Sequence, residues 1–272
     1  MSLTAKTKVL AVLGDPVGHS LSPLMHNGWI GDHGIDAVYV ALRVSDDASA
    51  FFAGLKSAGF HGVNVTVPHK ELAARAADRS GLAVANTLRW AEDGVLEAFN
   101  TDGTGFTDAL EDAAPGWRAR VKSILILGAG GGARGIAETL QGDARMLIAN
   151  RTRARAEDLA LSIKNAEAAD WADLPVLFAQ ADLIVQTTTL GMGGNVSPAW
   201  PVAHCKAGAI IVDIVYRPLE TPLLKAARAR GLVGVDGLGM LIHQGARAFE
   251  IWFGVKPDTS KARERLMAAL KS

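Results

Sequence analysis

The stretch "SILILGAGGGARGIAETL", residues 123–140, predicts a strand, a glycine-rich turn and a helix in succession. Gly128, Gly130 and Ala133 fit the pattern G-x-G-x-x-A. The first glycine permits a tight turn, the second lets a pyrophosphate approach the backbone, and the small third residue permits close packing of helix on strand. The helix N-terminus then offers free N–H groups to phosphates. This context favours dinucleotide binding over a turn that merely needs glycine. The residues expected at the dinucleotide are Gly128, Ala129, Gly130, Gly131, Gly132 and Ala133.

The residues after the next predicted strand indicate which dinucleotide is bound. That strand ends at Asn150, 20 residues past Gly130, where an NAD-binding site usually places Asp or Glu for the ribose hydroxyls. This chain instead has "NRTRAR", residues 150–155. Guanidinium and hydroxyl groups would bind a 2′-phosphate that a carboxylate would repel. The sequence therefore favours NADP over NAD. The alternative is a solvated helix start, which fits Arg153 best. The residues predicted to bind NADP here are Asn150, Arg151, Thr152 and Arg155.

Short apolar runs alternate with helical patterns almost from end to end of the chain. Such alternation predicts βαβ units and parallel sheets, and hence an α/β fold with a doubly wound, Rossmann-type domain. A turn-rich stretch at residues 100–106 and a second one at 235–240 mark domain boundaries. We expect one α/β domain from residues 1–104 and 238–272, a dinucleotide-binding domain from residues 105–237, and a cleft between them. The predicted strands are 8–14, 37–44, 62–68, 123–130, 145–150, 182–189 and 209–216.

Composition narrows the class of protein. The 272 residues include 28 Lys plus Arg and 28 Asp plus Glu, so no net charge attracts nucleic acids or anionic membranes. Cys205 is the only cysteine, which excludes intramolecular disulfides and cysteine-based metal clusters, and no metal site is predicted. No stretch approaches the roughly 20 apolar residues of a membrane span, and the apolar run at residues 9–13 is too short for a signal peptide. We expect a cytoplasmic protein.

Polar residues in the first predicted domain suggest a small-molecule site. Ser22 precedes Pro23 and could cap a helix, but a helix start with Ser20 and Ser22 could also hold a small carboxylate. In "NVTVPHK", residues 64–70, Asn64 and Thr66 share one strand face, where cross-strand hydrogen bonding is the structural alternative. Lys70 follows the strand's carboxyl end, where open α/β sheets place ligands.

Other polar residues have structural explanations when each is taken alone. Asp102 lies in a predicted turn, Asn86 ends an apolar run, and Tyr216 follows a strand of the dinucleotide-binding domain. Gln244 lies on an apolar helical stripe and so faces an interior or a cleft. Together with one lysine and one aspartate beside a dinucleotide fold, these hydrogen-bonding groups suit a small polyhydroxylated substrate.

The sequence closely resembles the shikimate dehydrogenase family, in family order from about residue 11 to residue 254. The resemblance implies NADP-dependent, reversible reduction of 3-dehydroshikimate to shikimate, an oxidoreductase step in aromatic amino acid and chorismate biosynthesis. It also implies that the first domain binds the substrate. The matching stretches are "SLSPLMHN", "GVNVTVPHK", "VANTL", "NTDGTGF", "GAGGGARG", "NRTRAR", "DIVYRPLETPLL" and "GLGMLIHQGARAFEIWFG".

The resemblance also implies the roles of individual residues. Lys70 and Asp102 would be the catalytic pair, with Lys70 stabilising and protonating the oxygen that becomes negative during hydride transfer. An exchange of the two roles stays open, because coupled groups titrate as a unit. Ser20 and Ser22 would bind the substrate carboxylate. The ring hydroxyls would meet Asn64, Thr66, Asn86 and Gln244, with Tyr216 nearby, and Ile214 and Gly237 would lie near the nicotinamide.

Some positions depart from the family pattern, and other functions are open. Gln186 and Thr189 replace the usual Asn and Pro, Ala83 replaces a glycine, and Gly245 stands where alanine is common. One alternative is a quinate or aminoshikimate dehydrogenase of the same family, with NAD in place of NADP as a further alternative. Others are a folate-linked dehydrogenase and a catalytically silent NADP-binding regulator, which retention of the lysine and the aspartate argues against. The expected partner is a small-molecule substrate, and the expected state is a monomer or a homodimer.

Overall fold

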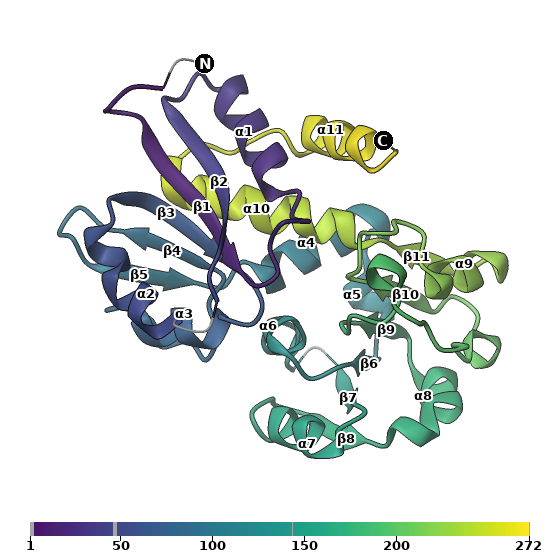
Figure 1. Ribbon diagram of the computed structural model, residues 1–272. Helices are drawn as coiled ribbons and strands as arrows, with labels where there is room; N and C mark the ends of the chain where they lie inside the picture. The colour runs from purple at the N-terminus through teal and green to yellow at the C-terminus, as the bar shows by residue number, and fades with distance from the viewer. Residues whose placement is uncertain (1–2, 46–47, 143, 272) are drawn as a thin grey trace. The chain divides into compact units, whose positions relative to one another are not determined.

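The structure is a computed structural model that describes residues 3–45, 48–142 and 144–271. Residues 1 and 272, where the first predicted domain begins and ends, lie outside the described residues. The chain divides into two compact units (Figure 1): the first unit holds the residues up to Asp102 and from Ile242 onward, and the second unit holds Gly103–Leu241. Each unit is built on its own β-sheet. Within the described part of the chain, no helix combines the length and apolar composition that crossing a membrane requires.

A mixed sheet in the order β2-β1-β3-β4-β5 forms the centre of the first unit. β1 pairs in parallel with β2 and β3, whereas β4 runs antiparallel to both β3 and β5. Val63 and Val65 of β3 pack with the residues of α2 and α3, so Asn64 faces the opposite side of the sheet. The strands are β1 Lys8–Gly14, β2 Ala37–Arg43, β3 Phe60–Val65, β4 Thr87–Trp90 and β5 Leu96–Phe99.

The helices of the first unit bring the end of the chain against its beginning. Trp29 Nε1 on α1 donates to the carbonyl of Asp258, just before α11, at 2.9 Å. Arg265 on α11 pairs with Asp32 on α1 at 2.5 Å, and Figure 1 shows the two helices near each other. The helices are α1 Ser22–Asp32, α2 Ala48–Gly54, η1 Leu55–Ser57, α3 Lys70–Ala76 and α11 Thr259–Lys271, together with the carboxyl-terminal part of α10 Gly237–Phe253.

A parallel sheet in the order β11-β10-β9-β6-β7-β8 forms the centre of the second unit. Counted from the unit's first strand, this is the doubly wound order 3-2-1-4-5-6, in which ligands bind where the strand order reverses. The strands are β6 Ser123–Leu127, β7 Arg145–Ala149, β8 Ala166–Ala169, β9 Leu183–Gln186, β10 Ile210–Asp213 and β11 Val233–Val235.

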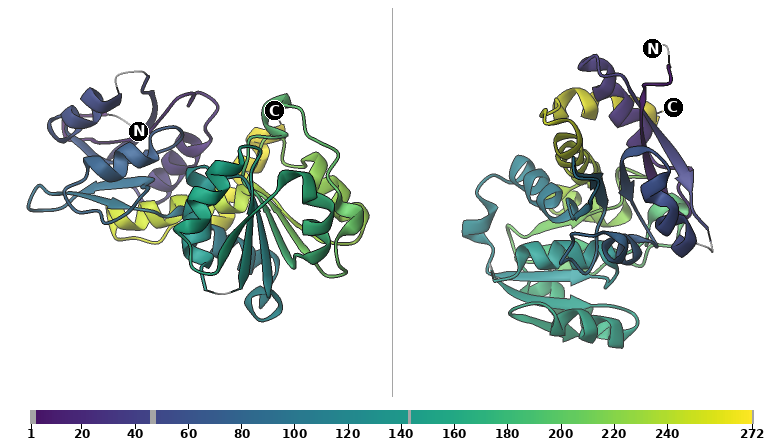
Figure 2. Two further views of the ribbon diagram at one scale, coloured as in Figure 1. Left: turned by 90° about the horizontal axis from the view of Figure 1, so that it is seen from below. Right: turned by 90° about the vertical axis from the view of Figure 1, so that its left-hand side faces the viewer.

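Helices cover both faces of the parallel sheet (Figure 2). Ile124 and Ile126 of β6 pack with α6 and α7, whereas Leu125 and Leu127 pack with α8 and α9. Burial on both faces explains why β6 is apolar from Ile124 to Leu127. The helices are α4 Asp102–Ala113, α5 Trp117–Arg120, α6 Gly131–Leu140, α7 Arg153–Leu161, η2 Trp171–Asp173, α8 Leu174–Gln180, η3 Met192–Gly194, η4 Val202–His204 and α9 Pro222–Ala229.

The predicted α/β class and the doubly wound sheet are confirmed, but some predicted details of the strands are wrong. The sequence does not predict β4, β5, β8 or β11, because these short strands lack the continuous apolar runs that mark β9 and β10, which are no longer than four residues themselves. The third predicted strand ends at Val65 rather than at residue 68, so Thr66 lies beyond it.

The turn predicted at Asp102 is also wrong, because α4 begins at this residue and continues to Ala113. The glycine at position 103 serves helix packing instead of a turn. A Cβ on Gly103 would collide with Thr139 Oγ1 and would lie 2.7 Å from the carbonyl of Gly135, both on α6. Glycine is therefore required for the close approach of α4 and α6, and this requirement is invisible in the local sequence.

His26 on α1 is a buried histidine with an electrostatic cost. It is 1% exposed, its ring stacks on Tyr39 at a centroid distance of 4.3 Å, and neither ring nitrogen has a hydrogen-bond partner among the described residues. Burial lowers the pKa of His26 from 6.5 to about 3. As the pH falls below 6.5, the unfolded chain therefore binds a proton that the folded chain does not. Above pH 6.5 the titration of His26 therefore takes nothing from the free energy of unfolding. Below this pH the free energy of unfolding falls progressively, because protonation favours the unfolded chain.

We predict that His26→Phe flattens this dependence. Between about pH 7 and about pH 5, the wild-type free energy of unfolding should fall by about 2 kcal/mol more than that of the variant. Urea titrations at a series of pH values would measure the difference. The same change at the exposed His204 is the control and should leave the pH dependence as in the wild type. Equal slopes for wild type and His26→Phe would contradict the prediction.

Candidate functional site

Lys70 and Asp102 form a buried ion pair in the first unit. Each is the first residue of a helix, α3 and α4 respectively, and their side chains are only 13% and 7% exposed. Lys70 Nζ donates a hydrogen bond to Asp102 Oδ2. Removing one partner of such a pair would leave an uncompensated buried charge, so each side chain depends on the other. The start of α4 also favours a carboxylate, because the partial positive charge of the helix lies there.

Asn86 connects the ion pair to other predicted site residues. Its Nδ2 donates to Asp102 Oδ1 at 2.9 Å and lies 2.9 Å from Thr101 Oγ1 and 3.3 Å from Gln244 Oε1. Its Oδ1 accepts the backbone N–H of Thr101 at 2.8 Å. The side chain is buried, so these bonds fix its orientation. The structure thus brings Lys70, Asp102, Asn86 and Gln244 into one network.

Asn64 joins this network from β3. Its Nδ2 donates to the carbonyl of Asn86 at 3.1 Å and to Thr87 Oγ1 at 3.0 Å, both on or beside the neighbouring strand β4. Its Oδ1 accepts the hydroxyl of Tyr39 at 2.7 Å. Asn64 therefore makes the cross-strand hydrogen bonds of the structural alternative, and it is held rigidly beside Asn86.

Tyr39 is a residue of this region that the sequence does not indicate, because an aromatic side chain on an alternating strand predicts only core packing. Burial raises the pKa of Tyr39 well above its ordinary value, and a hydrogen bond with Ser22 opposes this effect less strongly. The phenol is therefore protonated and donates to Asn64. Its hydroxyl links Ser22 on α1 to the network, which only the folded chain can reveal.

The capping role that the sequence allows for Ser22 is wrong. Leu21, not Ser22, is the N-cap of α1, and no side chain caps this helix end. Ser22 is instead the first helical residue and is buried, while Ser20 Oγ accepts the backbone N–H of Ser22 at 3.2 Å. Thr66 is half-buried, and its N–H donates to the carbonyl of Leu13 at 2.8 Å. In the described part of the chain, no hydrogen bond joins the hydroxyls of Ser20 and Thr66 to Asn86.

The glycine-rich turn of the second unit fits a dinucleotide. Gly128 has a φ of +115°, which favours glycine, and a Cβ there would lie 2.5 Å from Thr187 Oγ1. Gly130 is the N-cap of α6 and has no protein atom within 4 Å of the position of a Cβ. No side chain of the described residues caps this helix end, so its N–H groups are available to a pyrophosphate. Ala133 is buried between helix and sheet.

The segment after β7 carries the predicted NADP-selecting arginines. Asn150 Nδ2 donates to the carbonyl of Thr152 at 2.8 Å and so holds the turn that precedes α7. Arg153 begins α7 and pairs with Glu157 and Asp170 at 2.8 and 2.9 Å. Arg151 and Arg155 are exposed, and within residues 3–45, 48–142 and 144–271 neither forms an ion pair. Their guanidinium groups are therefore available to a 2′-phosphate.

The remaining predicted residues lie after the last strands of the second unit: Ile214 and Tyr216 follow β10, and Gly237 begins α10 after β11. Ile214 N donates to the carbonyl of Gln186 at 3.0 Å, and a Cβ on Gly237 would collide with the Ile214 backbone. Tyr216 is half-buried beyond the end of β10. Burial raises the pKa of Asp213 at the strand end from 3.8 to about 6, although its hydrogen bonds with Thr221, Val215 and Gln186 oppose this rise.

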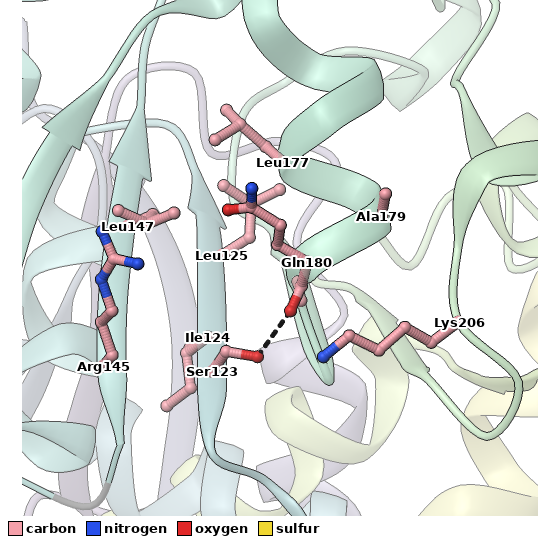
Figure 3. A pocket seen from close by; sticks show the side chains of 10 residues that line it. Ser123, Ile124, Leu125, Arg145, Leu147, Leu177, Ala179, Gln180 and Lys206 are labelled. Atoms are coloured by element: carbon pink, nitrogen blue, oxygen red, sulfur yellow. Dashed lines mark hydrogen bonds between the residues drawn. The ribbon is translucent and has the colours of Figure 1, made fainter.

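A pocket of about 380 Å³ lies elsewhere on the second unit (Figure 3). It is formed at the amino ends of β6 and β7, with Ser123 donating to the carbonyl of Gln180 at 2.8 Å. Its cations are already paired, Lys206 with Asp182 and Arg145 with Glu167. The glycine-rich turn is at the other end of β6, so this pocket is separate from the predicted cofactor site. The described residues contain no cluster of His, Cys, Asp or Glu suited to a metal ion.

The Rossmann-type sheet with its glycine-rich turn and the buried lysine–aspartate pair are together the features of a dinucleotide-dependent dehydrogenase. Family models match three parts of the chain: "Shikimate dehydrogenase substrate binding domain" at residues 12–86, "Shikimate / quinate 5-dehydrogenase" at 112–214 and "Shikimate 5'-dehydrogenase C-terminal domain" at 237–267. A Mesorhizobium japonicum protein named shikimate dehydrogenase (NADP(+)) is 46% identical, covering 97% of this chain and 96% of its own length. The chain belongs to the shikimate dehydrogenase family.

Solved structures share the fold along almost the whole chain. Shikimate 5-dehydrogenase from Thermus thermophilus, in complex with NADP(H) and shikimate, has a TM-score of 0.85 and 34% identity, over 97% of this chain and 100% of that chain. Quinate dehydrogenase from Corynebacterium glutamicum, in complex with NAD, has a TM-score of 0.88 and 29% identity, over 96% and 99% of the two chains. The fold thus accommodates both substrates and both dinucleotides in different proteins.

Proposed function

We propose that the protein catalyses the NADP-dependent, reversible reduction of 3-dehydroshikimate to shikimate. The observation that carries the proposal is the buried Lys70–Asp102 pair, held by Asn86 and bordered by Gln244. Relatives of 42–46% identity that are named shikimate dehydrogenase (NADP(+)) support the same activity. The product would serve the biosynthesis of chorismate and the aromatic amino acids.

Lys70 performs the proton chemistry in this proposal. NADPH bound at the glycine-rich turn would supply a hydride to the carbonyl carbon of the substrate, and negative charge would then develop on the carbonyl oxygen. The ammonium group of Lys70 stabilises this charge and gives the oxygen a proton. Asp102 holds Lys70 by accepting its hydrogen bond, and Asn86 holds Asp102 through the second carboxylate oxygen. In the oxidation of shikimate, Lys70 takes the proton back.

Substrate recognition follows from the hydrogen-bonding groups of the first unit. Ser20 and Ser22, at the start of α1, bind the carboxylate. Asn86 and Gln244 bind the ring hydroxyls together with Thr66, Asn64 and Tyr216. Asn64 already uses its amide on protein acceptors, so it offers the substrate only the remaining capacity of its Oδ1.

In this proposal one domain binds the substrate and the other binds NADP. Residues 1–104 and 238–272 form the substrate-binding domain, and residues 105–237 bind NADP through the glycine-rich turn, Arg151 and Arg155. Ile214 and Gly237 lie at the nicotinamide. The buried free thiol of Cys205 suits a cytoplasmic location, and the zero net charge suits a protein without a nucleic-acid partner. A monomer or a homodimer is the expected state.

The function is tested by initial rates with shikimate or quinate, each paired with NADP or NAD. We expect shikimate with NADP to give the highest kcat/KM, measured by the absorbance of the reduced nicotinamide. Preference for quinate or NAD would overturn the specificity but keep the oxidoreductase chemistry. A protein that binds NADP yet gives no rate with any pair would instead be a regulator.

The choice of NADP is tested by Arg151→Ala with Arg153→Ala as a matched control. Among the residues that the structure describes, Arg151 has no ion-pair partner, whereas Arg153 pairs with Glu157 and Asp170. Loss of a charge-assisted contact with the 2′-phosphate should raise KM for NADP at least about tenfold and leave KM for NAD within about twofold. Arg153→Ala should change neither value much. Equal effects of the two substitutions would count against Arg151 as a 2′-phosphate ligand.

Replacement of Lys70 tests the proton chemistry. Lys70→Met keeps most of the side-chain volume and should lower kcat by about a hundredfold or more, because the proton donor is lost. The unpaired Asp102 is expected to destabilise the fold, so the double variant Lys70→Met/Asp102→Asn serves as a control without a buried charge. NADP+ binding, measured by calorimetry, should persist in both variants. Near-normal kcat in Lys70→Met would exclude Lys70 as the proton donor.

A further inference from the structure

Gln186 is the last residue of β9 and is completely buried. β9 is the neighbour of β6 in the parallel sheet, and these two strands flank the point where the strand order reverses. Gln186 therefore lies at the carboxyl-terminal edge of the sheet, where a doubly wound fold binds its ligand. A buried amide needs partners for two N–H groups and an oxygen, so its hydrogen bonds identify what it holds in place.

The amide of Gln186 holds the backbone of the loop that follows it. Its Nε2 donates to the carbonyls of Thr188 and Leu190 at 3.1 and 3.2 Å, and its Oε1 accepts the N–H of Thr188. Nε2 also lies 3.3 Å from Asp213 Oδ1. A side chain thus supplies the partners that regular secondary structure would supply elsewhere. Asparagine, one methylene shorter, could not reach all of these atoms.

The loop held in this way packs against the glycine-rich turn. The N–H and Oγ1 of Thr187 both donate to the carbonyl of Leu127, at 2.9 and 2.7 Å. A Cβ on Gly128 would lie 2.5 Å from Thr187 Oγ1 and 3.0 Å from Thr188 Cγ2. Movement of Thr187 or Thr188 would therefore change the environment of the first glycine of the turn.

The backbone of Gln186 contacts the other side of the predicted cofactor site. Its carbonyl accepts the N–H of Ile214 at 3.0 Å. A Cβ on Gly132 of the turn would lie 3.5 Å from Ile214 Cδ1, so Ile214 in turn reaches the start of α6. Asp213 is itself fixed, because it accepts the hydroxyl of Thr221 at 2.7 Å and the N–H of Val215 at 3.0 Å.

We propose that Gln186 is a positioning residue for the dinucleotide: its amide fixes Thr187–Leu190 against the glycine-rich turn and thereby sets the affinity for NADP. The inference rests on the proposed NADP site. Gln186 itself does not contact the dinucleotide in this proposal and acts through the loop and Ile214, which it holds in place. The proposal assigns it no contact with the substrate. Loosening the loop should therefore lower the affinity for the dinucleotide and leave the affinity for the substrate unchanged.

The test compares Gln186→Met, which keeps the length and removes the hydrogen bonds, with Gln186→Asn, which keeps a shorter amide. Gln180→Met, an exposed glutamine at the opposite edge of the sheet, is the matched control. Calorimetry would give Kd for NADP+ in the absence of substrate, and steady-state kinetics would give KM for shikimate at saturating NADP+. We expect Kd for NADP+ to rise about tenfold in Gln186→Met and less in Gln186→Asn, with KM for shikimate unchanged.

Hydrogen exchange at the Thr188 amide, which donates to Gln186 Oε1, provides a second readout in the free protein. It should accelerate in Gln186→Met and stay unchanged in Gln180→Met. Faster exchange with an unchanged Kd would overturn the proposal, because the loop would then be loosened without consequence for the dinucleotide. Equal increases in Kd for NADP+ and KM for shikimate would also overturn it, since they would indicate general damage to the fold.

The outcomes separate this inference from the proposed function. A wild type that turns over shikimate, with a Gln186→Met variant of normal Kd, would refute the role of Gln186 alone. A wild type that binds NADP+ without turnover would refute the function, while the Kd comparison would still decide the role of Gln186. If Gln186→Met does not fold, Gln186→Asn decides the matter by the same comparison.

Discussion

The polar core of the first unit depends on the requirement that two buried charges remain paired and hydrogen-bonded. Lys70 and Asp102 are both mostly withdrawn from water, so their attraction has to compensate for lost hydration. Asp102 gains a further donor from Asn86, whose other contacts reach Gln244 and Thr101. A substitution at any residue of this hydrogen-bond network would leave a buried polar group without its partner. The requirement explains why the starts of α3 and α4, the residue before β4 and helix α10 all supply polar side chains to one place.

The second unit meets a similar requirement with uncharged groups. At the end of β9 the chain leaves the sheet, and its backbone loses the partners that a neighbouring strand would provide. The amide of Gln186 replaces those partners for Thr188 and Leu190. In this unit a hydrogen-bonded side chain therefore shapes a loop, whereas in the first unit an ion pair shapes a polar cluster.

The sequence predicts those features that arise from local patterns. Each of these patterns is a contiguous stretch of the chain, so its structural role can be inferred without knowledge of the fold. They are the glycines after Leu127, the apolar run of β6 and the arginines after Asn150. The turn-rich stretch at residues 100–106 predicts a turn at Asp102, and only the close approach to Thr139 and Gly135 shows why Gly103 lies in a helix.

Tyr39 shows which part of the candidate site cannot be predicted from the sequence. Its bonds to Asn64 and Ser22 join residues from β2, β3 and α1, and no spacing in the sequence encodes that meeting. The same limit explains why β8, with the sequence AEAA, escapes detection: its strand state is imposed by pairing with β7 rather than by its own propensity.

The departures from the family pattern in the first unit have local explanations. A Cβ on Gly245 would collide with the terminal methyl of Met25, so the methionine occupies the space that an alanine methyl would fill. Met25 is flexible and packs without a polar requirement, and the adjacent Gln244 keeps its contact with Asn86. Ala83 is exposed, and Asn165 is the only non-glycine residue with positive φ in the described part of the chain, so position 83 has no backbone need for glycine. Relative to the family pattern, position 245 lacks a methyl group and position 83 has an additional one. Both differences leave the polar network of Lys70 and Asp102 intact.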